Sequence, residues 1–241
     1  KGVDYVFNMA CNMGGMGFIE NNKAECMQSV LINTNLLIAC KEDNVKKYFF
    51  SSSACAYNKT KQQDVFIEGL KEEDAYPAEP EDGYGWEKLF SERMCRHFLE
   101  DFGLKTYVAR FHNIFGPLGT FDGGREKSPA ALCRKIATSK FLNHKEIEIW
   151  GDGNQTRSYL YIEDCLDAVM KLLDSNFHEP VNIGSEEFLK SIGVSSMAIP
   201  FAASMAAATA ASRCRCVATT VAAACNFAES VLGDVKGIAV L

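Results

Sequence analysis

Tyr84 and Lys88 are the two residues whose types and spacing most directly suggest chemistry. They are four residues apart in a segment with helical character, so they share one face of the predicted helix. A phenol is a poor base at neutral pH, but a cation beside it favours the phenolate and lowers its pKa. Such a pair can take a proton from an alcohol. An ordinary exposed tyrosine and lysine would explain the spacing alone equally well.

A serine cluster gives this pair a context. The apolar run over 46–50 predicts a strand, and Ser51, Ser52 and Ser53 follow it, then Ala54 and Cys55. In open α/β sheets, ligands bind outside the carboxyl ends of parallel strands, where these hydroxyl groups are expected. A strand, a serine cluster and a Tyr-x-x-x-Lys pair about thirty residues later form a much rarer combination than the pair alone.

The elements that must position these side chains alternate between strands and helices through residues 1–187. Strands are expected at Val3–Asn8, Lys47–Ser53, Leu104–Arg110, Ile147–Trp150 and Pro180–Ile183, and helices at 23–43, Gly83–Phe102, Ser128–Lys140 and Glu163–Leu173. This alternation predicts an α/β fold with a doubly wound, Rossmann-like parallel sheet and helices on both faces.

The composition excludes several classes of function. The 241 residues carry a net charge of −6, so no basic surplus exists for a phosphate backbone and we predict no nucleic-acid partner. The ten cysteines show no metal-ligand spacing, and we predict no metal site. Several lie inside helical patterns, which favours reduced thiols and a cytoplasmic location. The N-terminus has no signal-peptide core, and the chain is expected to begin within a longer protein.

Residues 188–241 have a different composition. Alanine dominates 198–228 together with Ser and Thr, and no charge occurs between Ser191 and Ser212. Few large aliphatic residues are present, so we predict no membrane span. A helix or a disordered tail remains as the interpretation. We expect this tail to be unrelated in pattern to residues 1–187 and to make few long-range contacts.

Five segments carry a resemblance to a known family. They are Met13–Phe18, Ser52–Cys55, Arg110–Asn113, Gly123–Ala131 and Trp150–Ser158. With the Tyr84–Lys88 pair, they resemble the extended short-chain dehydrogenase/reductase superfamily and, within it, the GDP-mannose 3,5-epimerase family. The resemblance covers residues 3–187. It implies a cytoplasmic NAD-dependent enzyme that acts on GDP-mannose and, at full length, forms a homodimer.

The resemblance also implies roles for single residues. Ser53 would bond the sugar hydroxyl, Tyr84 would take its proton as a hydride passes from C4 to NAD⁺, and Lys88 would tune Tyr84 and hold the nicotinamide ribose. Cys55 and Lys127 would then exchange protons at C3 and C5. The residues implied to bind the substrate are Gly14, Ser53, Ala54, Cys55, Asn113, Glu126, Lys127, Ser128, Lys135, Gln155, Thr156 and Arg157.

Elementary chemistry independently supports Cys55 and Lys127 as an acid–base pair. Epimerisation beside a ketone needs a base on one face and an acid on the other. A thiol near cations has a lowered pKa, which would suit Cys55 to such a role. Lys127 precedes a predicted helix, where a cation is disfavoured unless it meets an anion such as a diphosphate, and Arg125 adds to the repulsion. A solvated basic turn is the alternative for Lys127. A turn cap is the alternative for Asn113.

Two features depart from the family. No Gly-x-x-Gly-x-x-Gly turn follows a first strand, and the run over 3–8 matches the family's fourth strand. We therefore expect a partial domain with part of a smaller substrate-binding region, lacking the N-terminal part and inactive by itself. The alanine-rich tail matches nothing in the family. Another nucleotide-sugar epimerase or dehydratase, and a non-catalytic remnant, stay open as alternatives.

Overall fold

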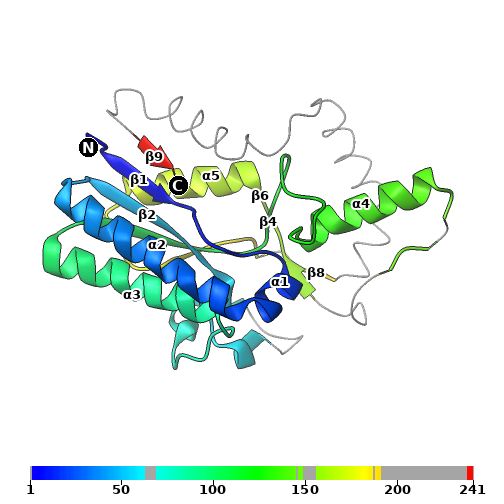
Figure 1. Cartoon of the computed structure of the whole chain (residues 1–241), viewed down its shortest axis with the longest axis horizontal. Coiled ribbons are helices and arrows are strands. Elements are labelled where there is room, and N and C mark those ends of the chain that lie inside the picture. The colour runs from blue at the N-terminus through cyan, green and yellow to red at the C-terminus, as the bar shows by residue number, and fades with distance from the viewer. Residues whose placement is uncertain are drawn as a thin grey trace.

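A five-stranded parallel sheet organises the fold, as expected from the sequence (Figure 1). Its order is β7-β3-β2-β1-β9, with β1 at Tyr5–Asn8, β2 at Lys47–Ser53, β3 at Lys105–Phe111, β7 at Val181–Ile183 and β9 at Ile238–Val240. The computed structural model describes residues 2–62, 69–144, 146–148, 156–186, 188–190 and 238–240. In this part of the chain every neighbouring pair in the sheet is parallel.

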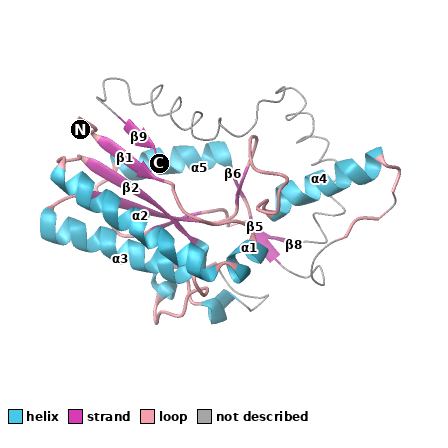
Figure 2. Cartoon of the chain, in the orientation of Figure 1, coloured by secondary structure: helices cyan, strands magenta, loops and turns pink. Residues whose placement is uncertain are grey.

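Helices cover both faces of the sheet, so this is a doubly wound arrangement (Figure 2). α2 (Lys23–Glu42) and α3 (Tyr84–Phe102) pack side by side on one face, and α5 (Ile162–Asp174) lies on the other. Successive residues of β2 point to opposite faces: Tyr48 and Phe50 belong to the core under α2 and α3, and Phe49 to the core under α5. Burial on both sides explains why these strands are continuous apolar runs.

The remaining elements lie outside the main sheet and the three helices on its faces. They are α1 (Met16–Asn21), α4 (Ser128–Phe141), β4 (Ile114–Phe115), β5 (Thr156–Ser158), β6 (Leu160–Tyr161), β8 (Phe188–Lys190) and the 3-10 helices η1 (Ala54–Ala56), η2 (Lys59–Gln62) and η3 (Glu72–Ala75). β4 pairs with β6 in parallel, and β5 pairs with β8 in antiparallel fashion. α4 projects away from the sheet (Figure 1).

One prediction about strands is wrong. The strand expected over 147–150 is absent from its described residues, 147 and 148; the rest lie outside the described part of the chain. Here the carbonyl groups of Glu146 and Glu148 accept hydrogen bonds from Ser139 and Lys135 of α4, so they do not join a sheet. β8 and β9 contribute backbone pairing from 188–190 and 238–240, a part of the chain where the sequence shows no alternation of strands and helices.

The described helices include none with the length and hydrophobicity needed to cross a bilayer. The seven described cysteines are free thiols: Cys11, Cys26, Cys40, Cys55, Cys95, Cys133 and Cys165. Five of them lie on helices, as the spacing of apolar residues predicts.

Candidate active site

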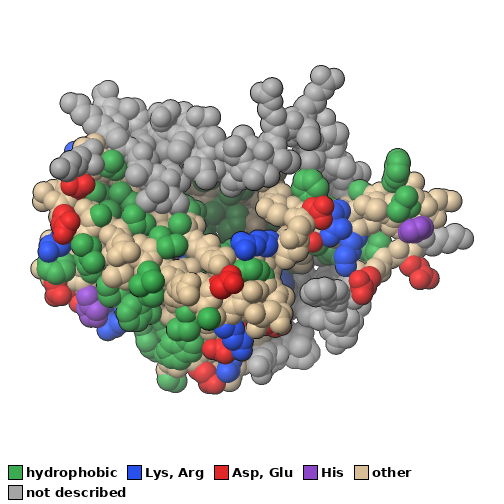
Figure 3. All heavy atoms as spheres, viewed as in Figure 1, with side chains coloured by type: hydrophobic (Ala, Val, Ile, Leu, Met, Phe, Trp, Pro, Cys, Tyr) green, Lys and Arg blue, Asp and Glu red, His purple; other side chains and the backbone are tan. Residues whose placement is uncertain are grey.

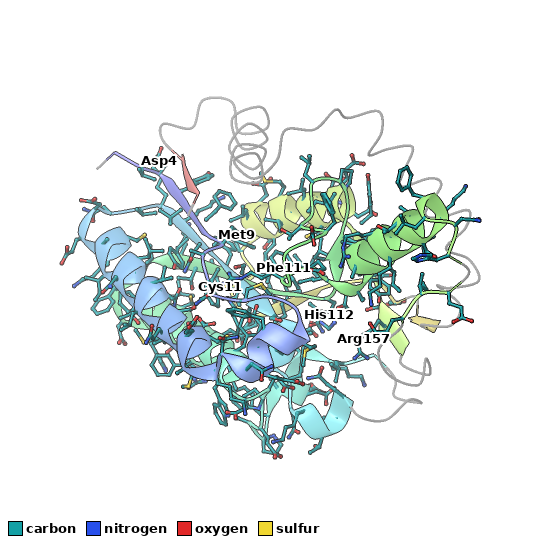
Figure 4. The ribbon with its side chains drawn as sticks, turned by 45° about the vertical axis from the view of Figure 1, so that its right-hand side comes forward. Asp4, Met9, Cys11, Phe111, His112 and Arg157 are labelled. Atoms are coloured by element: carbon teal, nitrogen blue, oxygen red, sulfur yellow. The ribbon has the colours of Figure 1, made fainter. Side chains whose placement is uncertain are left out.

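The candidate site forms where the segments after β1, β2 and β3 leave the sheet. Figure 4 shows Met9 and Cys11 after β1 and Phe111 and His112 at the end of β3, at the same end of the sheet. Ser53 ends β2, and its hydroxyl accepts a hydrogen bond of 3.2 Å from the backbone N–H of Cys55. The sequence therefore turns from strand to 3-10 helix at the residue expected to meet the substrate.

Tyr84 is the first residue of α3 and is 4% exposed. It packs in a cluster with Ile19 and Cys26, against which Cys11 and Cys55 also lie. Burial raises the pKa of Tyr84 well above its ordinary value, and the neighbouring thiols add to this, while a hydrogen bond with Ser53 opposes it. The expectation of a lowered pKa is therefore wrong for Tyr84 in this structure, because loss of hydration outweighs the nearby cation.

Lys88 lies one helical turn after Tyr84 and is fully buried. Its Nζ atom donates a hydrogen bond of 2.9 Å to the carbonyl oxygen of Ser51. The same ammonium lies 5.4 Å from the centre of the Tyr84 ring and 4.8 Å from that of Phe50. The end of β2 thus fixes the cation beneath the tyrosine. This is the pairing that the four-residue spacing predicts.

Gly85 allows α3 to approach the serine segment closely. A Cβ atom at this position would lie 2.2 Å from the carbonyl oxygen of Cys55 and 3.1 Å from the side chain of Pro80. No side chain fits such a contact, so only glycine lets Tyr84 sit beside Ser53 and Cys55. The requirement comes from tertiary packing, and the sequence analysis assigned no role to Gly85.

Cys55 is partly buried in η1. Burial raises the pKa of its thiol, while the Ser53 hydroxyl and the charges of Lys127 and Lys88 lower it; Glu81 acts with burial. The expectation that nearby cations leave a lowered pKa is wrong, because desolvation is the largest effect. The charges of Lys127 and Lys88 both act on this thiol, which keeps its proton at neutral pH in this structure.

The rate of alkylation of Cys55 tests how burial and Lys127 together set the pKa of its thiol. The thiolate is the reacting species, so Cys55 should react with iodoacetamide more slowly than free cysteine at pH 8. Lys127→Ala removes a charge that lowers the thiol pKa, and should slow the reaction further. Lys127→Arg keeps the charge and is the control. Rates are measured by mass spectrometry of the Cys55 peptide from pH 7 to 10. Equal rates for the alanine and arginine variants would remove Lys127 from the site.

The segment 123–127 reaches the site by packing against the turn before α1. A Cβ atom on Gly15 would lie 3.0 Å from the carbonyl oxygen of Glu126, and one on Gly14 would lie 3.3 Å from the side chain of Arg125. The Arg125 guanidinium stacks 4.3 Å from the centre of the Phe18 ring. Lys127 follows directly as the residue before α4. The two glycines therefore allow a basic segment to approach the thiol of Cys55.

Comparison with known proteins shows the family of this chain. The model of the NAD dependent epimerase/dehydratase family matches residues 1–184. The chain belongs to this family. GDP-mannose 3,5-epimerase from Arabidopsis thaliana is 48% identical over 202 residues, which are 83% of this chain and 52% of that protein. GDP-mannose 3,5-epimerase 1 from Oryza sativa subsp. japonica is 51% identical over 190 residues, 78% of this chain and 49% of that protein.

The epimerase/dehydratase chain thus spans about half the length of the curated relatives it matches. Solved structures agree on the fold. UDP-glucose 4-epimerase from Thermotoga maritima, solved with UDP-glucose, superposes with a TM-score of 0.68 at 23% identity, covering 83% of this chain and 61% of that one. A GDP-6-OMe-4-keto-L-xylo-heptose reductase from C. jejuni gives a TM-score of 0.71 at 20% identity, with coverage of 83% and 68%.

The other residues expected to bind substrate lie around α4 and β5 of this epimerase/dehydratase domain. Asn113 has a φ of +34°, and its amide donates a hydrogen bond of 3.0 Å to the carbonyl oxygen of Ser158, so it links the segment after β3 to β5. The Ser128 hydroxyl bonds that of Tyr159 at 3.0 Å. Lys135 donates to the carbonyl oxygen of Glu148 at 2.8 Å.

The last five residues expected at the site are Ala54, Glu126, Gln155, Thr156 and Arg157. Ala54 opens η1 beside Ser53, and the Glu126 carboxylate accepts a hydrogen bond of 2.9 Å from Arg134. Arg157 is exposed on β5, and Figure 4 shows it at the α4 side of the sheet's end. Thr156 begins β5. Gln155 lies outside the described residues.

A buried ion pair supports the site from below and was not predicted. Arg110 on β3 donates through Nε and Nη2 to the two carboxylate oxygens of Glu92 on α3, at 2.9 and 2.7 Å. The Ser52 hydroxyl donates to the same carboxylate at 2.5 Å. The pair thus ties β3, α3 and the serine end of β2 together. A lone Arg and a lone Glu in the sequence carry no signal of such a contact.

Proposed function

We propose that this chain carries the catalytic residues of an epimerase that inverts GDP-mannose at C3 and C5 through a 4-keto sugar. The observation that supports it best is the position of Cys55, beside Tyr84 and within the field of Lys127. Simple oxidation at C4 needs only Tyr84 and Lys88. A thiol and a second cation at the same place supply what proton exchange beside a ketone requires. The relatives named GDP-mannose 3,5-epimerase favour this substrate.

The mechanism begins at Tyr84. Ser53 would hold the C4 hydroxyl, and Tyr84 would take its proton, helped by the ammonium of Lys88 below the ring. The resulting ketone acidifies the hydrogens on C3 and C5. Cys55 and Lys127 would then remove and return protons at these carbons from opposite sides. The exchange needs one member of the pair without its proton, and the charge of Lys127 stabilises the Cys55 thiolate once the thiol has lost its proton. The alcohol would be restored when Tyr84 returns its proton to the oxygen and the hydride returns to C4.

The described residues fit NAD⁺ at its nicotinamide end. A buried ammonium and a phenol lie at the carboxyl ends of parallel strands, where nucleotides bind in this class of sheet. Lys88 would hold the nicotinamide ribose beside Tyr84. The sequence contains no Gly-x-x-Gly-x-x-Gly turn for the pyrophosphate. When bound, NAD⁺ supplies reversible hydride transfer at C4, and the net reaction is an isomerisation.

Solvent-deuterium incorporation into GDP-mannose tests the proposal. With NAD⁺ in D₂O, we expect no measurable exchange by the 241-residue chain alone, because it lacks a pyrophosphate-binding turn. A fusion that adds the segments by which the Arabidopsis relative is longer than this chain should incorporate deuterium at C3 and C5. Exchange by the chain alone would contradict the first expectation.

The same assay separates the alternatives. Inversion at C4 without label at C3 and C5 would indicate a 4-epimerase, and loss of water a dehydratase. A folded fusion that binds GDP-mannose without any exchange would indicate a non-catalytic remnant. Mass spectrometry and proton NMR of the recovered sugar nucleotide distinguish these products.

We further propose that the chain forms a homodimer through the outer face of α2 and α3. Met27, Leu31 and Ile38 are exposed on α2, and Trp86 and Phe90 on α3. Their spacing places each set on one face of its helix. Figure 3 shows hydrophobic side chains gathered over these two helices. A second copy would bury both rows in a four-helix contact.

Analytical ultracentrifugation checks the dimer. The wild-type chain should sediment as a dimer at micromolar concentration, and Leu31→Glu combined with Phe90→Glu should give a monomer, because two charges would be buried at the contact. Phe141→Glu is the control, since Phe141 is 88% exposed on α4, away from this face. A monomeric wild-type chain, or a dimer that survives the double substitution, would contradict the proposal.

We propose a cytoplasmic location. The seven described cysteines are free thiols, which suits a reducing compartment.

A further inference from the structure

Glu87 lies between Tyr84 and Lys88 on α3 and has no part in the proposed chemistry. Its side chain is 1% exposed, like that of Lys88, and its Oε2 atom lies 3.7 Å from Lys88 Nζ. The other oxygen accepts a hydrogen bond of 3.1 Å from the Ser91 hydroxyl. Oε2 has no hydrogen-bond partner among the described residues. A buried carboxylate in this condition depends on a nearby cation for its charge.

The titratable groups facing this pair are otherwise neutral at pH 7. They are Cys26 on α2, Tyr48 on β2, Cys55 in η1, and Tyr84 and Cys95 on α3, and burial raises the pKa of each. Glu92 is a second buried carboxylate on α3, but both of its oxygens are held by Arg110 of β3. Among the described residues, Glu87 is therefore the carboxylate that balances the Lys88 ammonium.

We propose that Glu87 is a positioning residue whose carboxylate acts as the counter-ion that holds the Lys88 ammonium beneath the Tyr84 ring. The inference rests on the proposed function, because the place of Lys88 matters to chemistry only if Tyr84 is the base. Two anchors define the position of the ammonium: the Ser51 carbonyl from β2 and Glu87 from α3. The Ser91 hydroxyl in turn fixes the carboxylate by its second oxygen.

The coupling between the two charges can be measured on Glu87 itself. Burial raises the pKa of Glu87, and Lys88 and Ser91 oppose this rise. Energetic coupling is reciprocal, so the effect of Lys88 on Glu87 equals the effect of Glu87 on Lys88. In the 241-residue chain, Lys88→Met should raise the Glu87 pKa by about one unit or more, whereas Lys88→Arg should keep it near the wild-type value. Carbon-13 NMR of the side-chain carboxyl group follows this titration, and Glu87→Gln assigns the signal.

A second readout covers the case in which Lys88→Met does not fold. The Lys88 ammonium should give a protected signal in nitrogen-15 NMR of the wild-type chain at pH 7. Glu87→Gln should remove or broaden that signal, and Glu87→Asp, which keeps the charge, should restore it. Ser91→Ala should weaken it by releasing the carboxylate.

The outcomes are distinct. A change in Glu87 pKa below about 0.3 units in folded Lys88→Met, or an unchanged ammonium signal in folded Glu87→Gln, overturns the proposal, because a close buried pair is expected to shift by more. Neither readout needs turnover or bound nucleotide. Failure of the proposed function would therefore leave the ion-pair result standing, and failure of the ion-pair result would leave the deuterium assay standing.

Discussion

Tyr84→Phe should abolish hydride transfer in the active fusion, whereas Cys55→Ala should leave it near the wild-type value and block inversion at C3 and C5. The phenylalanine ring keeps the packing against Ile19 and Cys26 but cannot accept a proton. Loss of a general base typically lowers the rate by about 100- to 10,000-fold. Cys55→Ala removes only the thiol, so the ketone still forms. Stopped-flow absorbance of the reduced nicotinamide measures the first step, and deuterium incorporation the second.

The contrast between the two variants is the decisive result. Arg96→Ala, a change on the exposed side of α3, is a control that leaves Tyr84 and Cys55 in place. Equal loss of hydride transfer in Tyr84→Phe and Cys55→Ala would contradict the division of roles. Inversion at C3 or C5 that persists in Cys55→Ala would remove the thiol from the acid–base pair.

Arg110→Ala should lower the free energy of unfolding by about 3–5 kcal/mol, because it leaves the buried carboxylate of Glu92 without its cation. Arg110 and Glu92 are both about 3% exposed. Arg110 also donates to the Glu72 carbonyl at 2.8 Å and stacks 4.8 Å from the centre of the Tyr57 ring, so the substitution loses contacts to the segment before α3 as well. Urea unfolding followed by circular dichroism gives the change.

Arg96→Ala is the matched control. It removes an arginine–carboxylate pair with Glu100 on the same helix, but both side chains are about half exposed. Exposed pairs contribute about 0.2–1 kcal/mol, so this variant should unfold close to the wild type. If Arg110→Ala were no more destabilised than Arg96→Ala, the ion pair below the site would have no structural role.

The main sheet could be predicted from the sequence because its strands are buried on both faces. β2 and β3 appear as apolar runs, and the helices between them show apolar residues at helical spacing. β4, β6 and α1 could not be predicted in the same way, since elements of two to six residues depend on tertiary contacts more than on local preference. At 147–148, side chains of α4 take the backbone bonds that a strand would have used.

The candidate site, too, could be predicted only in part. The spacing of Tyr84 and Lys88 and the serine run before Cys55 are local features, and the structure places these residues together. The direction of the pKa changes is not local, because it depends on how many atoms exclude water from Tyr84 and Cys55. The sequence analysis did not predict that Cys11 lies beside Tyr84, because this contact also depends on tertiary packing. Its place after β1 was the available signal, since ligand sites collect at strand ends.

The two outer strands of the sheet limit pairing of its edges with strands of other molecules. β7 and β9 each have three residues, while the inner strands β2 and β3 have seven. An outer strand exposes unpaired N–H and C=O groups that can template fibril growth, and short outer strands limit this hazard. Because β9 covers β1, the longer β1 is not the terminal strand. Removal of 238–240 would expose β1 and should increase thioflavin-positive aggregation on storage.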